Sequence, residues 1–194
     1  MEVFHDAEVI VCADAAQWES WLAAHHEQPG GVWLKIAKQG SGKGSITIRE
    51  ALDIALCYGW IDSQRTAYDA AYYLQRYSRR RPKSPWSKRN SDRAEALMAA
   101  GRLRAPGLAE IRAAKADGRW AAAYESQRTA SVPPDLAVAL EQNERAKSVF
   151  DRLDKTSQYA VILPLLKATT PGNRSVHLQK AIAKLEAGHH ASPR

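Results

Sequence analysis

The sequence has few residues of the kinds that build cross-linked or metal-centred folds. Its 194 residues include two cysteines, Cys12 and Cys57, and no Cys-x-x-Cys pair. Disulfide frameworks and cysteine-based zinc knuckles are therefore excluded, and a reducing compartment is expected. The six histidines form no His-Glu-x-x-His motif and no triad-like grouping. We therefore expect neither a metal nor a cofactor.

Long apolar runs are also missing. No stretch approaches the roughly 18–20 apolar residues that a membrane-spanning helix needs. The first twelve residues, MEVFHDAEVIVC, have no basic region ahead of an apolar run, which is the pattern of a secretory signal. We therefore expect a cytoplasmic protein that does not insert into a membrane.

The composition is that of an ordinary globular protein, with 45% hydrophobic and 25% charged residues. It suits one compact domain, or one domain with an appended helical bundle. The net charge of +7 is concentrated. Eleven basic and three acidic residues between positions 65 and 104 carry +8, whereas the other 17 basic and 18 acidic residues carry −1. Such a concentration attracts phosphates, nucleic acids and acidic protein surfaces.

The hydrophobic pattern changes once along the chain. In the first half, short β-branched or alternating segments predict strands at residues 8–12, 32–38, 63–66 and 72–79. Thr47 and Glu50 have the spacing of a capping box, which predicts the start of a helix. From residue 87 onward, apolar residues recur at helical spacing. The prediction is an α+β fold, with a small antiparallel sheet and helices in the N-terminal half and a helical C-terminal half.

This change of pattern predicts three parts of the chain. An α+β subdomain is expected at residues 1–90, a helical subdomain packed on it at 91–188, and a frayed tail at 189–194. In the helical part, Thr156 is expected to cap one helix, and Pro164 is expected to kink it.

A glycine-rich loop at residues 40–45 lies between a predicted strand and a predicted helix, as a nucleotide-binding loop does. A Walker loop needs a glycine five positions before its Gly-Lys pair, and a Ser or Thr after the lysine. Ala37 and Gly44 occupy those two positions. The spacing therefore rejects a P-loop and leaves open only a connection that holds an anion through backbone N–H groups.

The basic segment (residues 79–90, RRRPKSPWSKRN) is the most unusual part of the chain. Its two prolines restrict the backbone, and Ser87 or Asn90 can cap the helix that follows. One interpretation is an anion or nucleotide site at a helix N-terminus, with Trp86 as a stacking surface. The candidate binding residues are Arg79, Arg81, Lys83, Ser84, Trp86, Ser87, Lys88, Arg89 and Asn90.

The other interpretation is that Trp86 is a core residue and that the arginines pair with Asp53, Asp62 or Glu95. Burial is favoured for Trp86, because tryptophans in small domains are usually buried. The bases as a set favour a binding site, since three local acidic residues cannot neutralise eleven basic ones. No catalytic residue is assigned. Glu50 and Asp62 are the candidates for an acid–base pair, whereas Cys57 falls on the apolar side of its helix and is interpreted as packing.

Two long motifs resemble a known family: EALDIALCYGWID at residues 50–62 and RRRPKSPWSKRN at 79–90. The similarity continues through residues 101–136 and ends with the TPGNR motif at 170–174. Over roughly residues 8–187 the chain is similar to the bacteriocin-protection family, also labelled YdeI/OmpD-associated or OmdA-like. That family has a second basic residue after the position of Arg174, where Val176 and His177 stand here. The resemblance implies protection against bacteriocins or antimicrobial stress and association with a porin, but no reaction.

Three functions are consistent with these features. The leading hypothesis is a cytoplasmic protein whose basic segment holds an anionic small molecule or an acidic protein surface. The second is an enzyme acting on a phosphorylated or carboxylated small molecule, with Asp62 or Glu50 as the acid–base group and the arginines as an electrostatic clamp. The third is a nucleic-acid-binding protein, which needs a continuous basic surface rather than a pocket.

Overall fold

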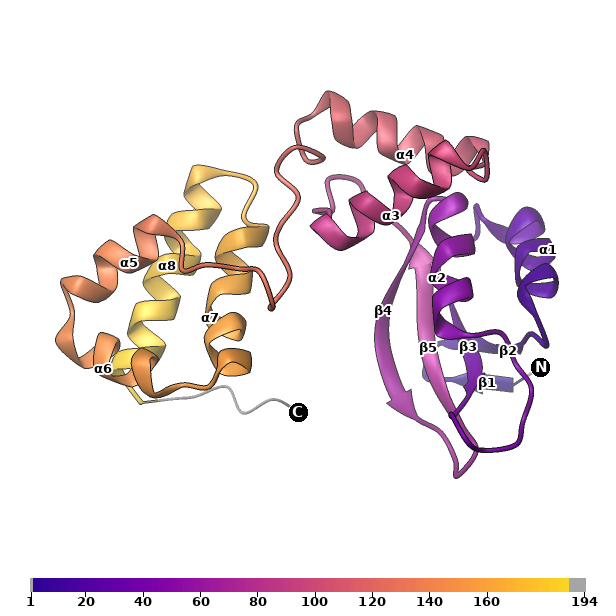
Figure 1. The fold of residues 1–194 in the computed structure, drawn as a ribbon, viewed down its shortest axis with the longest axis horizontal. Helices are drawn as coiled ribbons and strands as arrows, with labels where there is room; N and C mark the ends of the chain where they lie inside the picture. The colour runs from indigo at the N-terminus through magenta and orange to yellow at the C-terminus, as the bar shows by residue number, and fades with distance from the viewer. Residues whose placement is uncertain (1, 189–194) are drawn as a thin grey trace. The chain divides into compact units, whose positions relative to one another are not determined.

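The computed structural model describes residues 2–188, which form five strands and eight helices (Figure 1). These residues lie in two compact units. Among the described residues, unit 1 consists of residues 2–84 and Asn90–Trp120, and unit 2 consists of Pro85–Arg89 and residues 121–188. The frayed tail expected at 189–194 lies outside the described residues. The expected division into subdomains at residue 90 stays a prediction. In space, most of α3 (Lys88–Ala99) and all of α4 (Ala105–Ala116) lie in unit 1.

Unit 1 is built on a five-stranded sheet with the order β1-β2-β3-β5-β4. The strands are β1 (Glu2–Phe4), β2 (Ala7–Val11), β3 (Val32–Ala37), β4 (Trp60–Ala67) and β5 (Tyr72–Arg79). Three of the four pairings are antiparallel, and β2 and β3 run parallel. The parallel pair arises because α1 (Ala15–His25) connects the two strands and carries the chain back to the same end of the sheet. The α+β fold is confirmed, and its sheet is mixed rather than purely antiparallel.

Two helices pack on the face of the sheet that carries Tyr77. On α1, the Trp18 ring lies 5.4 Å from the Tyr77 ring, and its Nε1 donates a hydrogen bond of 3.0 Å to the carbonyl of Ala51. Ala51 belongs to α2 (Ile48–Cys57), so one tryptophan joins both helices to the sheet. The predicted capping box is present at the start of α2, where Thr47 and Glu50 bond reciprocally.

The end of α2 is tightly packed. Trp60 is fully buried, and its Nε1 donates to the carbonyl of His26 at 2.8 Å. Cys57 is buried on the apolar side of α2, as predicted, and burial raises the pKa of its thiol to about 11. A Cβ atom on Gly107 of α4 would lie 2.4 Å from the Cys57 carbonyl oxygen, so only glycine permits this approach of the two helices.

The opposite face of the sheet carries a smaller apolar cluster, in which Phe4 packs against Ala7, Val9, Trp33 and Leu74. Arg76 pairs with Trp33 across β3 and β5, and its guanidinium lies 5.5 Å from the centre of the Trp33 ring. Apolar side chains therefore cover only part of this face, and the Arg76 side chain lies over the Trp33 ring.

Unit 2 is helical, as predicted for the C-terminal half. It contains α5 (Pro134–Glu141), α6 (Glu144–Arg152), α7 (Lys155–Lys167) and α8 (Pro171–Glu186). Their core includes Leu136, Phe150, Ile162, Leu165 and Leu185. The prediction that Thr156 caps α7 is wrong, because the Asp154 carboxylate accepts from the Ser157 N–H at 2.7 Å and begins the helix. Within residues 2–188, no helix is both long and apolar enough to span a bilayer.

Candidate functional site: an arginine-lined concavity

An open concavity of about 940 Å³ lies beside β5 in unit 1 and is named the β5 concavity. Its walls come from the turn before β3, from β4 and β5, and from the chain that follows β5. The charged residues that line it are Arg76, Arg79, Arg80, Arg81, Asp6 and Glu110. Four arginines against two carboxylates give this lining a net positive charge.

Strand β5 supplies part of this lining through its alternation. Arg76 and Ser78 lie two residues apart and share one face of the strand, opposite the face of Tyr77 that packs on α1. The Arg76 guanidinium donates to the carbonyl of Gly30 at 2.7 Å, which joins β5 to the turn before β3. The next wall begins where β5 ends, and the Arg80 N–H donates to the carbonyl of Gly59 there.

The turn before β3 approaches β5 too closely for a side chain. Gly31 has a φ of 73°, a left-handed conformation that favours glycine. A Cβ atom at Gly31 would lie 2.5 Å from the Tyr77 carbonyl oxygen and 2.8 Å from the Ser78 Cβ. Glycine at this position therefore permits the contact that forms one wall of the concavity.

The arginines differ in how much of their charge is already used. Arg76 lies 3.5 Å from the exposed Asp6 carboxylate, a long ion pair in solvent that contributes little. Arg80 is buried, with 4% of its surface exposed. Arg79 and Arg81 are exposed, and no carboxylate among residues 2–188 forms an ion pair with either. Their charge is therefore available to an anion from solvent.

The loop after Arg81 is held in a tight turn. The Ser84 N–H donates to the Arg81 carbonyl at 3.0 Å, and Lys83 within this turn has a φ of 62°. Arg119 holds the loop, since its Nη1 donates to the Ser84 carbonyl at 2.8 Å. Its Nε donates to the Asp117 carboxylate, and this bond lowers the pKa of Asp117. The ion pair thus orients the side chain that positions the loop.

The structure separates the predicted binding residues. Arg79, Arg81 and Ser84 line the β5 concavity, and Lys83 is exposed in the adjoining turn. The residues that lie in unit 2 are Trp86, Ser87, Lys88 and Arg89, whereas Asn90 lies in unit 1. Trp86 is buried, with 2% of its surface exposed, as the core interpretation predicts. Ligand roles for the residues outside the concavity stay predictions.

The two acid–base candidates do not line the β5 concavity. Glu50 is exposed, and its carboxylate accepts from the Thr47 N–H at 3.0 Å and from the Thr47 hydroxyl at 2.7 Å. These bonds lower the pKa of Glu50. Asp62 is half-buried at the position on β4 that pairs with Tyr77. A catalytic role for either residue stays a prediction.

Sequence reasoning missed three parts of this arrangement: Arg76, the turn at Gly30 and Gly31, and Arg119. The alternation within β5 was a usable signal for Arg76, because it places this residue on the face of Ser78. Nothing local pointed to the others. Arg76 bonds a residue 46 positions away, and Arg119 bonds one 35 positions away.

Comparisons with known proteins match two family models. Residues 10–110 match the model described as a domain of unknown function (DUF8412), and residues 129–188 match the model described as Bacteriocin-protection, YdeI or OmpD-Associated (OmdA). The resemblance found in the sequence is therefore confirmed, and the model that confirms it covers the helices of unit 2. The motifs at 50–62 and 79–90 lie within the other match. No curated protein and no solved structure matches the chain significantly.

Proposed function

We propose that unit 1 of this chain, which belongs to the family described as a domain of unknown function (DUF8412), binds an anionic small molecule. The chain also matches the OmdA model at residues 129–188. The proposed site is the β5 concavity. One observation carries this proposal: the lining of the concavity contains four arginines and only two carboxylates. The arginines are Arg76, Arg79, Arg80 and Arg81. The ligand is a molecule that carries phosphate or carboxylate groups.

Arginine suits such a ligand because its planar guanidinium donates two parallel hydrogen bonds to a phosphate or a carboxylate. Arg76 is fixed by its bond to Gly30, so less conformational freedom is lost when an anion binds there. Arg79 and Arg81 are free to approach the ligand from the rim. The site thus combines a fixed donor with two adaptable ones.

The shape of the site favours a small molecule over the two rival hypotheses. A nucleic acid requires an extended basic surface, whereas these arginines line a hollow. An acid–base enzyme requires Asp62 or Glu50 beside the substrate, and neither lines this hollow. Binding without catalysis is therefore the simpler proposal for the β5 concavity.

Thermal unfolding of the intact protein tests this proposal. Inorganic pyrophosphate is compared with chloride at equal ionic strength, because screening of exposed charges is then matched. A ligand present at about 100 times its dissociation constant stabilises the native state by about 2.7 kcal/mol. For a chain of this length that corresponds to a rise of several degrees in the melting temperature. We expect this rise with pyrophosphate and not with chloride.

Two double variants make the test specific. Arg79→Gln/Arg81→Gln should remove most of the pyrophosphate effect, because both arginines line the concavity. Arg112→Gln/Arg145→Gln makes the same change in net charge at exposed positions on α4 and α6, so the effect should persist. An effect of equal size in both double variants would show that pyrophosphate acts on net charge alone, and the proposal would fail.

We further propose a role in tolerance of bacteriocins or related stress, which the name of the OmdA family suggests. The cytoplasm is the proposed location, and the free, buried Cys12 and Cys57 support a reducing compartment. The same double variants test the role when they are returned to a strain that lacks the protein. Survival under bacteriocin should be restored by Arg112→Gln/Arg145→Gln and not by Arg79→Gln/Arg81→Gln.

A further inference from the structure

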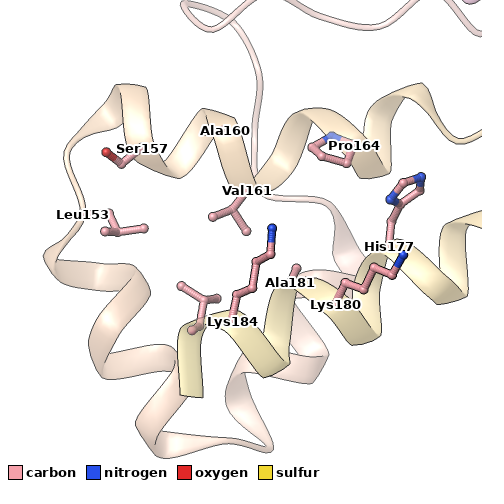
Figure 2. Close-up of a pocket in the computed structure, with 10 residues that line it drawn as sticks. Leu153, Ser157, Ala160, Val161, Pro164, His177, Lys180, Ala181 and Lys184 are labelled. Carbon is pink, nitrogen blue, oxygen red and sulfur yellow. The ribbon is translucent and has the colours of Figure 1, made fainter. Parts of the chain in front are cut away.

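Unit 2 contains a pocket of about 140 Å³ between α7 and α8, here named the α7–α8 pocket (Figure 2). On α7 its lining includes Ala160, Val161 and Pro164, and on α8 it includes Lys180, Ala181 and Lys184. Within each helix these residues are separated by one, three or four positions, so each set lies on one face. The two faces line the pocket, which is open to solvent on one side.

Small side chains explain why the two helices leave a space. Ala160 and Ala181 extend only to Cβ, and the compact ring of Pro164 takes the next turn of α7. The apolar wall continues to Leu153 and to Leu185, which is buried with 2% exposure in the core of unit 2. The interior of the pocket is therefore apolar and is supported by the packed core.

The volume limits what can enter. An engineered cavity of about 150 Å³ with an apolar lining is large enough to bind benzene. The α7–α8 pocket, at about 140 Å³, therefore fits an aromatic ring or a chain of about six carbons. Burial of such a group in a pre-formed apolar pocket is favourable, because its apolar surface is removed from water and the protein around the pocket needs little reordering.

The charged residues of this lining are Lys180 and Lys184, and the remaining polar ones are Ser157 and His177. Figure 2 shows the Lys184 ammonium directed toward α7 beside Val161, with Lys180 and His177 toward the other end. Both lysines are exposed, and no carboxylate among residues 2–188 forms an ion pair with either. The pocket therefore has a positively charged mouth and an apolar interior.

We propose that the α7–α8 pocket binds a small amphipathic anion. The apolar group of the ligand, about six carbons in size, occupies the space between Val161 of α7 and Ala181 of α8. Its anionic head, a carboxylate in the simplest case, lies between the ammonium groups of Lys180 and Lys184. This site lies in unit 2 and is independent of the function proposed for the β5 concavity.

Three probes with the same chain and different heads test this proposal on the intact protein: hexanoate, hexan-1-ol and hexylammonium. Binding is followed by the amide shifts of α7 and α8 in ¹H–¹⁵N NMR spectra. We expect saturable shifts with hexanoate, weaker binding of hexan-1-ol and no saturable shift with hexylammonium. Saturation with all three probes at equal affinity would show that Lys180 and Lys184 do not bind the anionic head, and it would contradict the proposal.

Variants separate the two parts of the site. Lys180→Gln/Lys184→Gln should raise the dissociation constant of hexanoate about threefold or more and leave that of hexan-1-ol unchanged. The matched control, Lys155→Gln/Lys167→Gln, removes two lysines from α7 that do not line the pocket and should bind hexanoate normally. Ala181→Leu places a larger side chain in the pocket and should abolish the shifts.

The lysine variants keep the test decisive if Ala181→Leu fails to fold, because Lys180 and Lys184 are exposed. Unchanged hexanoate affinity in Lys180→Gln/Lys184→Gln would overturn the proposal. An anionic lipid headgroup offers related chemistry, so vesicles of phosphatidylglycerol form a further arm. Binding to these vesicles by a protein that gives no shift with hexanoate would identify a membrane surface and would also overturn it.

Discussion

Lys83 lies in a backbone conformation that L-residues rarely adopt, and it does so at the edge of the candidate site. Its φ of 62° is imposed by the turn in which the Ser84 N–H bonds the Arg81 carbonyl. A left-handed conformation costs a residue with a Cβ roughly 1–2 kcal/mol, and glycine avoids most of that cost. Such strain persists only where the surroundings hold it, and here Arg119 fixes the loop through the Ser84 carbonyl.

We predict that Lys83→Gly stabilises the protein. Relief of strain exceeds the extra chain entropy of glycine in the unfolded state, so the net gain should be about 0.5–1 kcal/mol. Chemical unfolding of the wild type and the variant measures it. Lys83→Ala is the control, because it removes the same charge and keeps the Cβ. Equal stability of the glycine and alanine variants would show that the turn is not strained.

Helix α2 shows how a local signal supports a whole element. The Thr47 hydroxyl accepts from the Glu50 N–H at 3.2 Å, and the Glu50 carboxylate accepts from the Thr47 N–H. Two backbone N–H groups at the start of the helix are thereby satisfied. The same helix carries Cys57 into the core at its far end, and Trp60, the first residue of β4, is buried just after it. The start of α2 therefore affects the packing of the sheet.

We predict that Thr47→Ala destabilises the protein by about 1 kcal/mol at neutral pH, because the cap is lost. Its hydrogen bonds lower the pKa of Glu50 in the folded state. A lowered carboxyl pKa contributes stability above the unfolded value of about 4.3 and loses it as pH falls through the folded value. The difference between wild type and variant, measured by urea unfolding, should therefore shrink between pH 6 and pH 3.

Thr156→Ala is the matched control for this element. Thr156 lies in the first turn of α7, but Asp154 is the residue that caps that helix. Its removal deletes a hydrogen bond from Gln127 on the surface and no cap. The stability of this variant should stay within about 0.5 kcal/mol of the wild type, as expected for a surface substitution. A loss of stability larger than that in Thr47→Ala would show that Thr156 does stabilise the start of α7.

At the scale of the whole molecule, the chain between the α4 region and α5 is the part with least regular structure. Residues 121–133 contain no helix and no named strand, and Arg128 among them is exposed. Exposed segments without regular hydrogen bonding are the preferred sites of proteolysis. By contrast, most other arginines and lysines of unit 2 lie within helices.

We predict that limited trypsin digestion cuts early at Arg128 and at Lys43, which lies in the exposed glycine loop. The cut at Arg128 releases residues 129–194, the part that contains the OmdA match, and intact mass spectrometry identifies it. Arg128→Gln should abolish that fragment and leave the cut at Lys43. Early cleavage at Lys83 instead would show that Arg119 does not hold the loop beside the β5 concavity.

The features that the sequence determined by itself are those set by neighbours along the chain. Reciprocal hydrogen bonds three residues apart specify the cap of α2, and apolar spacing specifies the helices of the C-terminal half. Large apolar side chains on one helix face specify the burial of Cys57. Even here the local pattern was ambiguous, because Asp154 lies two residues before the predicted Thr156 and is the residue that caps α7. The family resemblance also rests on contiguous motifs.

Only the tertiary structure decided which distant residues meet. The bonds from Arg76 to Gly30 and from Arg119 to Ser84 depend on strand order and loop path, which no local pattern encodes. The space between α7 and α8 likewise depends on how these two separate helices pack, since residues of both line the pocket. The basic segment, continuous in sequence, is divided between two units. Side-chain type is local, but proximity follows from how the chain folds back on itself.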